Sequence, residues 1–236
     1  MSSIQRPPNQ FLQALPEAEF ELLRPRLKSF EMVREAVLTE SGVASAHVYL
    51  PHAGAVSIVV NLSEGQAVEV AMIGRDSLVG ALEALGDGIS ALDAVVLFPG
   101  AASIIDIADF RMIAGQSAAF RNLLARHEQA ILAQAQQSAA CNASHSVEAR
   151  VSRWLLRARD LCDGTALPMT QELLARLIGV QRNAISIVAH ALQRAGIISY
   201  SRGRIEITDS DALQATACEC YATVKAKYEQ LLKTAP

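Results

Sequence analysis

The densest hydrogen-bonding chemistry in this 236-residue sequence lies between Glu172 and Glu206. No Asp or Glu falls between these two residues, whereas five arginines do: Arg176, Arg182, Arg194, Arg202 and Arg204. A long segment with one sign of charge suits a polyanion. A guanidinium can bind a guanine edge through two hydrogen bonds, and an asparagine amide can do the same with adenine. The segment therefore predicts a surface that binds double-stranded DNA.

The elements that would position these side chains follow from periodicity and turn residues. Residues 170–177 predict a helix whose N-cap is Thr170, and Gly179 suits the turn that follows it. Residues 181–194 predict a second helix with an apolar face. Residues 197–200 and 204–207 predict two strands joined by a short turn. Together these elements form a winged helix-turn-helix, from about Pro168 to Thr208.

The start of the second helix is the part that should enter the major groove. On this helix we expect the DNA contacts to come from Gln181, Arg182, Asn183, Ser186, Ile187 and His190. Thr170 and Gln171 sit at the start of the first helix, where free backbone amides suit a phosphate. Arg202 and Arg204 would contact the adjacent backbone from the wing. The alternative is a winged helix that contacts only protein, which the absence of acidic residues disfavours.

Charge is distributed unevenly along the chain. The net charge is −3, which excludes a uniformly basic coat. Residues 1–145 carry a net charge of −6, and residues 146–236 a net charge of +3. This asymmetry indicates a basic functional module attached to an acidic one. The start of the chain does not resemble a signal peptide and no apolar run approaches the ~20 residues of a membrane span, so we expect a cytoplasmic protein without a membrane contact.

The N-terminal half predicts a different architecture. Residues 9–24 read as short helices. Short β-branched runs then occupy residues 48–50, 55–61, 67–73, 94–98 and 102–107. Even spacing of short strands predicts an antiparallel barrel or sandwich.

A long helix is predicted over residues 118–144, which contain no Gly or Pro. One stripe on it, at alternating steps of four and three, includes Phe120, Leu124, His127, Ile131 and Gln134. Such a seam is typical of a helix that pairs with a second copy, so these residues form our candidate dimer interface. The alternative is that the helix packs on its own barrel.

The sequence resembles the Crp/Fnr family of bacterial transcription regulators over most of its length. The resemblance rests on residues 167–175, 179–186 and 192–198, and in the first half on residues 48–51, 54–57 and 74–80. It implies an α+β fold with three parts: an N-terminal antiparallel β-roll (jelly-roll-like) sensor domain of the cyclic-nucleotide-binding type over residues 1–117, a long dimerisation helix over 118–145, and a winged helix-turn-helix domain with a C-terminal helical extension over 146–236. It also implies a homodimer that reads a pseudo-palindrome, and contact with RNA polymerase if the protein activates transcription.

The chain departs from the family pattern at informative positions. Asn183 replaces a glutamate, and Ile187 stands where a second arginine is common. In the sensor domain Ala81 replaces the glutamate after Gly80, and no Lys or Arg occurs between Arg75 and Arg111. A phosphate there would lack a cation, which disfavours cyclic AMP. The remaining alternatives are an unidentified small-molecule effector or a sensor that still responds to a nucleotide.

The spacing of the cysteines and histidines gives little support for a metal site, and the sequence gives little support for an enzyme. The cysteines are Cys141, Cys162, Cys218 and Cys220, with no Cys-x-x-Cys pair. On one helix Cys218 and Cys220 would point about 200° apart. His47, His52 and His127 are only weak haem-ligand candidates. We therefore expect no metal and no cofactor, and no motif indicates an enzyme.

Overall fold

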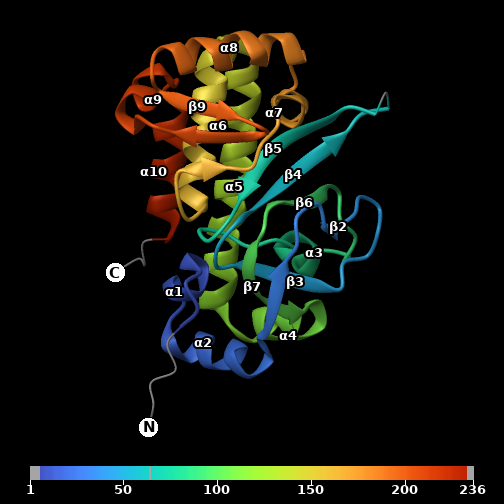
Figure 1. The fold of residues 1–236 in the computed structure, drawn as a ribbon. Coiled ribbons are helices and arrows are strands. Elements are labelled where there is room, and N and C mark those ends of the chain that lie inside the picture. Colours follow the sequence, from blue (N-terminus) through green and yellow to red (C-terminus); the bar gives the residue numbers. More distant parts are fainter. Residues whose placement is uncertain (1–5, 64, 233–236) are drawn as a thin grey trace.

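The computed structural model describes residues 6–63 and 65–232 and has an α+β fold, as predicted. Figure 1 shows α1 (Gln10–Ala14) and α2 (Glu17–Leu23) at one end of the molecule and α8 (Arg182–Arg194) at the other. A short 3₁₀ turn, Arg24–Arg26, follows α2. Asn9 caps α1 by accepting a hydrogen bond from the Leu12 amide, and Pro16 precedes α2.

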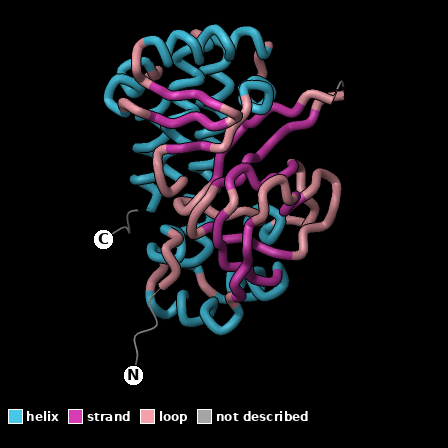
Figure 2. The backbone as a smooth tube through the Cα atoms, viewed as in Figure 1, coloured by secondary structure: helices cyan, strands magenta, loops and turns pink. Residues whose placement is uncertain are grey.

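Two antiparallel sheets form the N-terminal half (Figure 2). One sheet has the order β1-β7-β3 and contains Lys28–Met32, Gly100–Asp106 and His47–Pro51. The other has the order β2-β6-β4-β5 and contains Val37–Thr39, Asp93–Phe98, Ala55–Asn61 and Ala67–Ile73. The sequence pattern predicted five of these strands. It missed β1 and β2, as well as the short helix α3 (Ala81–Leu85).

A long helix, α5 (Ala118–Ser144), runs the length of the molecule after α4 (Ile107–Gln116) (Figure 1). Ser117 caps α5 by accepting a hydrogen bond from the Phe120 amide. The C-terminal helix α10 (Cys220–Leu232) packs along α5, where Val224 and Tyr228 meet Ala130. The C-terminal extension thus returns to the central helix rather than staying with the DNA-binding segment.

The predicted dimer stripe lies inside the chain itself. Phe120 and Leu124 are fully buried in a core with α1, α2 and α4. His127 and Gln134 are buried too, and only Ile131 is partly exposed. Burying the apolar half of the stripe against the protein's own barrel is the alternative that the pattern left open, and Phe120 and Leu124 follow that alternative in this structure.

The C-terminal half contains α6 (Val147–Leu161), α7 (Gln171–Ile178), α8 and α9 (Ser210–Thr216). A small sheet of order β8-β10-β9 accompanies them, formed by Ala166–Leu167, Arg204–Ile207 and Ile198–Ser201. Its core continues into the β4–β6 sheet, because Trp154 and Leu177 belong to the same apolar cluster as Met72 and Phe98. The two halves are therefore packed against each other, with α7 beside β5.

Candidate nucleic-acid interface and sensor contacts

The helix-turn-helix is formed by α7 and α8 as predicted. Thr170 is the N-cap of α7, and its Oγ1 accepts a hydrogen bond from the Leu173 amide at 3.1 Å. Gly179 follows with φ of 71°, a left-handed conformation that favours glycine. Ile185, Val188 and Leu192 on the inner face of α8 are buried.

The outer face of α8 is polar and exposed. Gln181, Arg182, Asn183 and His190 are exposed, and Ile187 has 71% of its surface accessible. In a major groove, an apolar side chain at this position can contact the methyl group of thymine. The exposed face therefore offers hydrogen-bond donors beside one apolar contact.

Two of the expected contact residues are already paired with each other. The Ser186 hydroxyl donates to Gln171 Oε1 at 2.6 Å and also lies 3.2 Å from the Arg182 carbonyl oxygen. This bond joins α7 to α8, so it fixes the angle between the helices of the motif. The Thr170 hydroxyl is likewise engaged, in the N-cap hydrogen bond of α7, although the residue remains exposed.

The wing carries two exposed arginines. Arg202 and Arg204 are exposed in and after the β9–β10 turn, and Arg202 adopts a positive φ of 48°. β9 and β10 pair in antiparallel register from Arg204 opposite Ser201 to Ile207 opposite Ile198. The guanidinium groups of α8 and of the wing thus lie on one module, a pattern that suits phosphates next to a groove.

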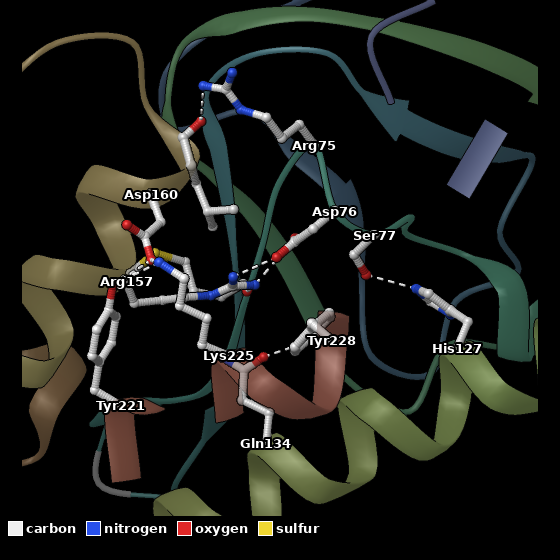
Figure 3. Close-up of polar contacts among 12 residues, drawn as sticks. Arg75, Asp76, Ser77, His127, Gln134, Arg157, Asp160, Tyr221, Lys225 and Tyr228 are labelled. Atoms are coloured by element: carbon white, nitrogen blue, oxygen red, sulfur yellow. Dashed lines mark hydrogen bonds and ion pairs between the residues drawn. The ribbon is translucent and has the colours of Figure 1, made fainter. Parts of the chain in front are cut away.

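A network of polar contacts joins this half of the chain, through α6, to the N-terminal half (Figure 3). The loop after β5 is at its centre. Arg157 on α6 binds both carboxylate oxygens of Asp76 and donates to the Met72 carbonyl at 2.8 Å. Arg75 reaches the Leu161 carbonyl oxygen and the Asp163 carboxylate, at 3.1 and 2.7 Å. A Cβ on Gly74 would lie 2.8 Å from the Leu161 side chain, so glycine permits this close approach.

The same loop is held by α5. His127 Nε2 accepts a hydrogen bond from the Leu78 amide at 3.2 Å and lies 2.6 Å from Ser77 Oγ. Nε2 is therefore an acceptor, which places the proton on Nδ1, 3.0 Å from Glu128. His52 and His47 also have partners, Ser103 and Asp106. All three histidines thus contact groups in their own half of the chain.

A cavity of about 160 Å³ lies beside this loop, between the β2-β6-β4-β5 sheet, α3 and α5. Its lining is mostly apolar, with Ile73, Leu78, Leu92 and Ile131 among its walls. The charged groups that line it within the described residues are the carboxylates of Glu83 and Glu128, with no Lys or Arg. An anionic ligand would face like charge there.

Glu69 on β5 forms a further contact between the halves. Its two oxygens accept hydrogen bonds from Ser57 Oγ at 2.6 Å and from Trp154 Nε1 of α6 at 2.8 Å. Burial raises the pKa of Glu69 to about 7, against the opposing effect of these hydrogen bonds and of Arg153 and Arg157.

Comparison with known proteins identifies the same module. Residues 149–216 match the family model of the Crp-like helix-turn-helix domain. No curated protein matches the sequence. None of the described helices is long and apolar enough to cross a membrane.

Solved structures share the fold over most of the chain. FixK2 from Bradyrhizobium japonicum is 17% identical, with a TM-score of 0.68 over 81% of this chain and 98% of that one. A CRP family regulator from Thermus thermophilus is 18% identical, with a TM-score of 0.66 over 80% and 96%. CLP from Xanthomonas campestris, described as a c-di-GMP responsive global regulator, is 17% identical, with a TM-score of 0.64 over 81% and 99%. Residues 149–216 therefore form a Crp-like helix-turn-helix domain, and the chain as a whole shares the fold of these regulators.

Proposed function

We propose that this protein binds a pseudo-palindromic operator as a homodimer, with the start of α8 in the major groove. The observation that carries the proposal is the exposure of Arg182, Asn183 and Ile187 on α8, in a module whose wing carries two further exposed arginines. Arg182 and Asn183 supply the base-edge hydrogen bonds, and Ile187 supplies an apolar contact. Arg202 and Arg204 bind phosphates.

Selection of bound sequences from a random DNA pool tests this reading. We expect two half-sites related by two-fold symmetry, with centres about 10 base pairs apart. The half-site should differ from that of regulators with an arginine at the position of Ile187. Enrichment of a sequence without two-fold symmetry would contradict the dimer, and no enrichment at all would contradict sequence-specific binding.

The dimer seam that we propose is the outward face of α5 rather than the predicted stripe. At alternating steps of four and three this face carries small or apolar residues and amides, all exposed: Ala118, Asn122, Ala125, Gln129, Leu132, Gln136, Ala139 and Ala143. Leu132, at its centre, has 58% of its surface accessible. Small residues at heptad spacing let two helices approach closely, and Leu132 would supply the central apolar contact.

We further propose that the cavity beside α5 holds a largely apolar effector that carries no negative charge. Its support is the apolar lining with Glu83 and Glu128 as the charged groups. Calorimetric titration with cyclic AMP, cyclic GMP and cyclic di-GMP should show no binding below millimolar concentration. A sub-millimolar affinity for any of them would favour the alternative, a nucleotide-responsive sensor.

A further inference from the structure

Four side chains with metal-binding atoms meet at the end of α5. Cys141 lies in the last turn of α5 and His145 is its C-cap residue, while Cys218 and Cys220 stand just before α10 and at its first residue. Their three sulfurs and the imidazole nitrogen all lie within 4.8 Å of one another. Cys141 Sγ is 3.5 Å from Cys218 Sγ, and Cys220 Sγ is 3.6 Å from His145 Nδ1.

The sequence spacing concealed this cluster for two reasons. The ligands come in two pairs separated by more than 70 residues, so no short motif exists. In addition, Cys218 and Cys220 do not share one helix, because α10 begins at Cys220. The angle of about 200° expected on a continuous helix therefore does not apply, and both thiols turn toward α5.

The distances suit one tetrahedral ion. With Zn–S bonds of about 2.3 Å, two sulfurs at the corners of a tetrahedron lie about 3.8 Å apart. The Cys141 and Cys218 sulfurs lie 3.5 Å apart, close to that value. Because a Zn–N bond is shorter, about 2.0–2.1 Å, a sulfur and a nitrogen at two corners lie about 3.5 Å apart. Cys220 Sγ and His145 Nδ1, at 3.6 Å, match that distance. Three sulfurs and one nitrogen form a ligand set that is common in structural zinc sites.

The surroundings provide what such a site requires. His145 turns Nδ1 toward the sulfurs and Nε2 toward the Glu219 carboxylate, at 3.3 Å. A carboxylate behind a ligating histidine fixes the orientation of the ring. Arg150 has only 8% of its surface exposed and interacts electrostatically with Cys141 and Cys218. Its Nε has no hydrogen-bond partner. Three thiolates around a divalent ion leave one negative charge, which this guanidinium would offset.

We propose that Cys141, His145, Cys218 and Cys220 form a zinc site that ties the end of α5 to the start of α10. The site stands at the connection between α5 and α6, where the sensor half passes into the DNA-binding half. A bound ion would hold the central helix, the C-terminal extension and the neighbouring α6 in one arrangement. We infer that the loss of zinc makes the position of α8 less well defined. This coupling to α8 rests on the proposed function, whereas the zinc site itself does not.

Metal analysis of the full chain tests the site directly. Protein without an affinity tag, incubated with zinc under reducing conditions and then desalted, should retain one ion per chain. Cys141→Ser and Cys218→Ser should lose it. Cys162→Ser is the matched control, because Cys162 lies outside the cluster, and it should retain the ion. Protein that keeps no zinc, or serine variants that keep as much as the control, would overturn the proposal.

Cobalt binding tests the site even if the serine variants fail to fold. Cobalt-loaded protein should show the visible bands of a tetrahedral cobalt ion and a near-ultraviolet thiolate-to-cobalt absorption. His145→Cys keeps four ligands, so it should bind cobalt with shifted bands, whereas His145→Ala should bind at least about tenfold more weakly. The weak spectrum of an octahedral ion, or an unchanged spectrum in His145→Cys, would contradict ligation by this set.

Two further measurements, of thiol reactivity and of operator affinity, distinguish a zinc site from a disulfide and the site itself from its coupling to α8. A chelator should expose three additional reactive thiols. A mass two hydrogens lower than that of the reduced chain, with no thiols exposed by the chelator, would instead show a disulfide and overturn the zinc site. A chelator should also weaken operator binding by about tenfold in the wild type. Unchanged operator affinity with one zinc lost would refute only the coupling, whereas protein that retains zinc but binds no operator would refute the proposed function and leave the site intact.

Discussion

Single side chains on α8 decide how this protein would read DNA. Arg182 is exposed at the first position of the helix, and Asn183 follows it. Their side chains were recognisable from the sequence because helix starts, charge and exposure all follow local patterns. The pairing of Ser186 with Gln171 was not, because it joins two helices whose angle depends on the turn at Gly179.

Replacing Arg182 with alanine should weaken operator binding by about 1–3 kcal/mol and relax the base preference at one position of each half-site. The reason is the loss of hydrogen bonds to a base edge while phosphate contacts remain. Fluorescence anisotropy on the selected operator and on single-base variants measures both effects. Arg24→Ala, just after α2 at the other end of the molecule, is the control. An equal loss on all sequences would show that Arg182 binds only phosphate.

Glu69 predicts a pH dependence of stability. The pKa of Glu69 is raised from its ordinary 4.5 to about 7 by burial. Below pH 4.5 the side chain is protonated in both folded and unfolded chains. Between pH 4.5 and 7 the unfolded chain releases the proton and the folded chain keeps it, so stability falls as pH rises and then levels off above 7.

Glu69→Gln should abolish this fall in stability between pH 4.5 and 7, which amounts to about 2 kcal/mol after allowance for partial exposure. The side-chain carbonyl of the glutamine can still accept the hydrogen bond from Trp154. Urea denaturation from pH 4.5 to 8 measures it, with the exposed Glu31→Gln as control. Identical pH profiles for Glu69→Gln and the wild type would contradict the raised pKa.

Elements show where periodicity succeeds and where it is ambiguous. The bounds of α5 follow from a segment without Gly or Pro, and its N-cap from Ser117. Its orientation does not follow, because two stripes on it have heptad spacing. The stripe through Phe120 and Leu124 faces the chain's own core, and the stripe through Leu132 faces outward. Only the packing of α1, α2 and α4 distinguishes them.

Leu132→Glu should dissociate the proposed dimer. Two-fold symmetry would bring both introduced carboxylates to the seam, and we expect association to weaken at least about a hundredfold, or ~2.7 kcal/mol. Light scattering after size-exclusion chromatography measures the mass over a concentration series. Val33→Glu is the matched control, because Val33 is 59% exposed just after β1 and belongs neither to this stripe nor to the cavity lining. A variant that stays dimeric would place the interface elsewhere.

At the scale of the whole molecule, the N-terminal half and the half that contains the helix-turn-helix are joined through the loop after β5. That loop lines the cavity with Leu78 and Val79, and two residues earlier Asp76 binds Arg157 of α6. A ligand that moves this loop would therefore act on α6 through a charged contact. Arg157 also stacks its guanidinium 4.7 Å from the ring of Tyr228 on α10, so three parts of the fold meet at one side chain.

Arg157→Met should destabilise the folded chain by about 3–5 kcal/mol, because the Asp76 carboxylate is left buried without its cation. Adding Asp76→Asn should recover part of that loss by removing the unpaired charge. Urea denaturation of the wild type, both single variants and the double variant gives the coupling energy. Additive effects, with no coupling, would show that the pair does not stabilise the junction.

The sequence by itself determined the elements whose signals are local: the helix-turn-helix with its N-cap and turn glycine, the length of α5, and most strands of the sheets. It also determined the chemistry of the α8 face, because side-chain type and helical position suffice there. The tertiary structure decided which stripe of α5 is buried, that α10 returns to α5, and that Cys141 and His145 meet Cys218 and Cys220. These are contacts between segments far apart in the chain, and they depend on how whole elements pack rather than on the pattern within any one of them.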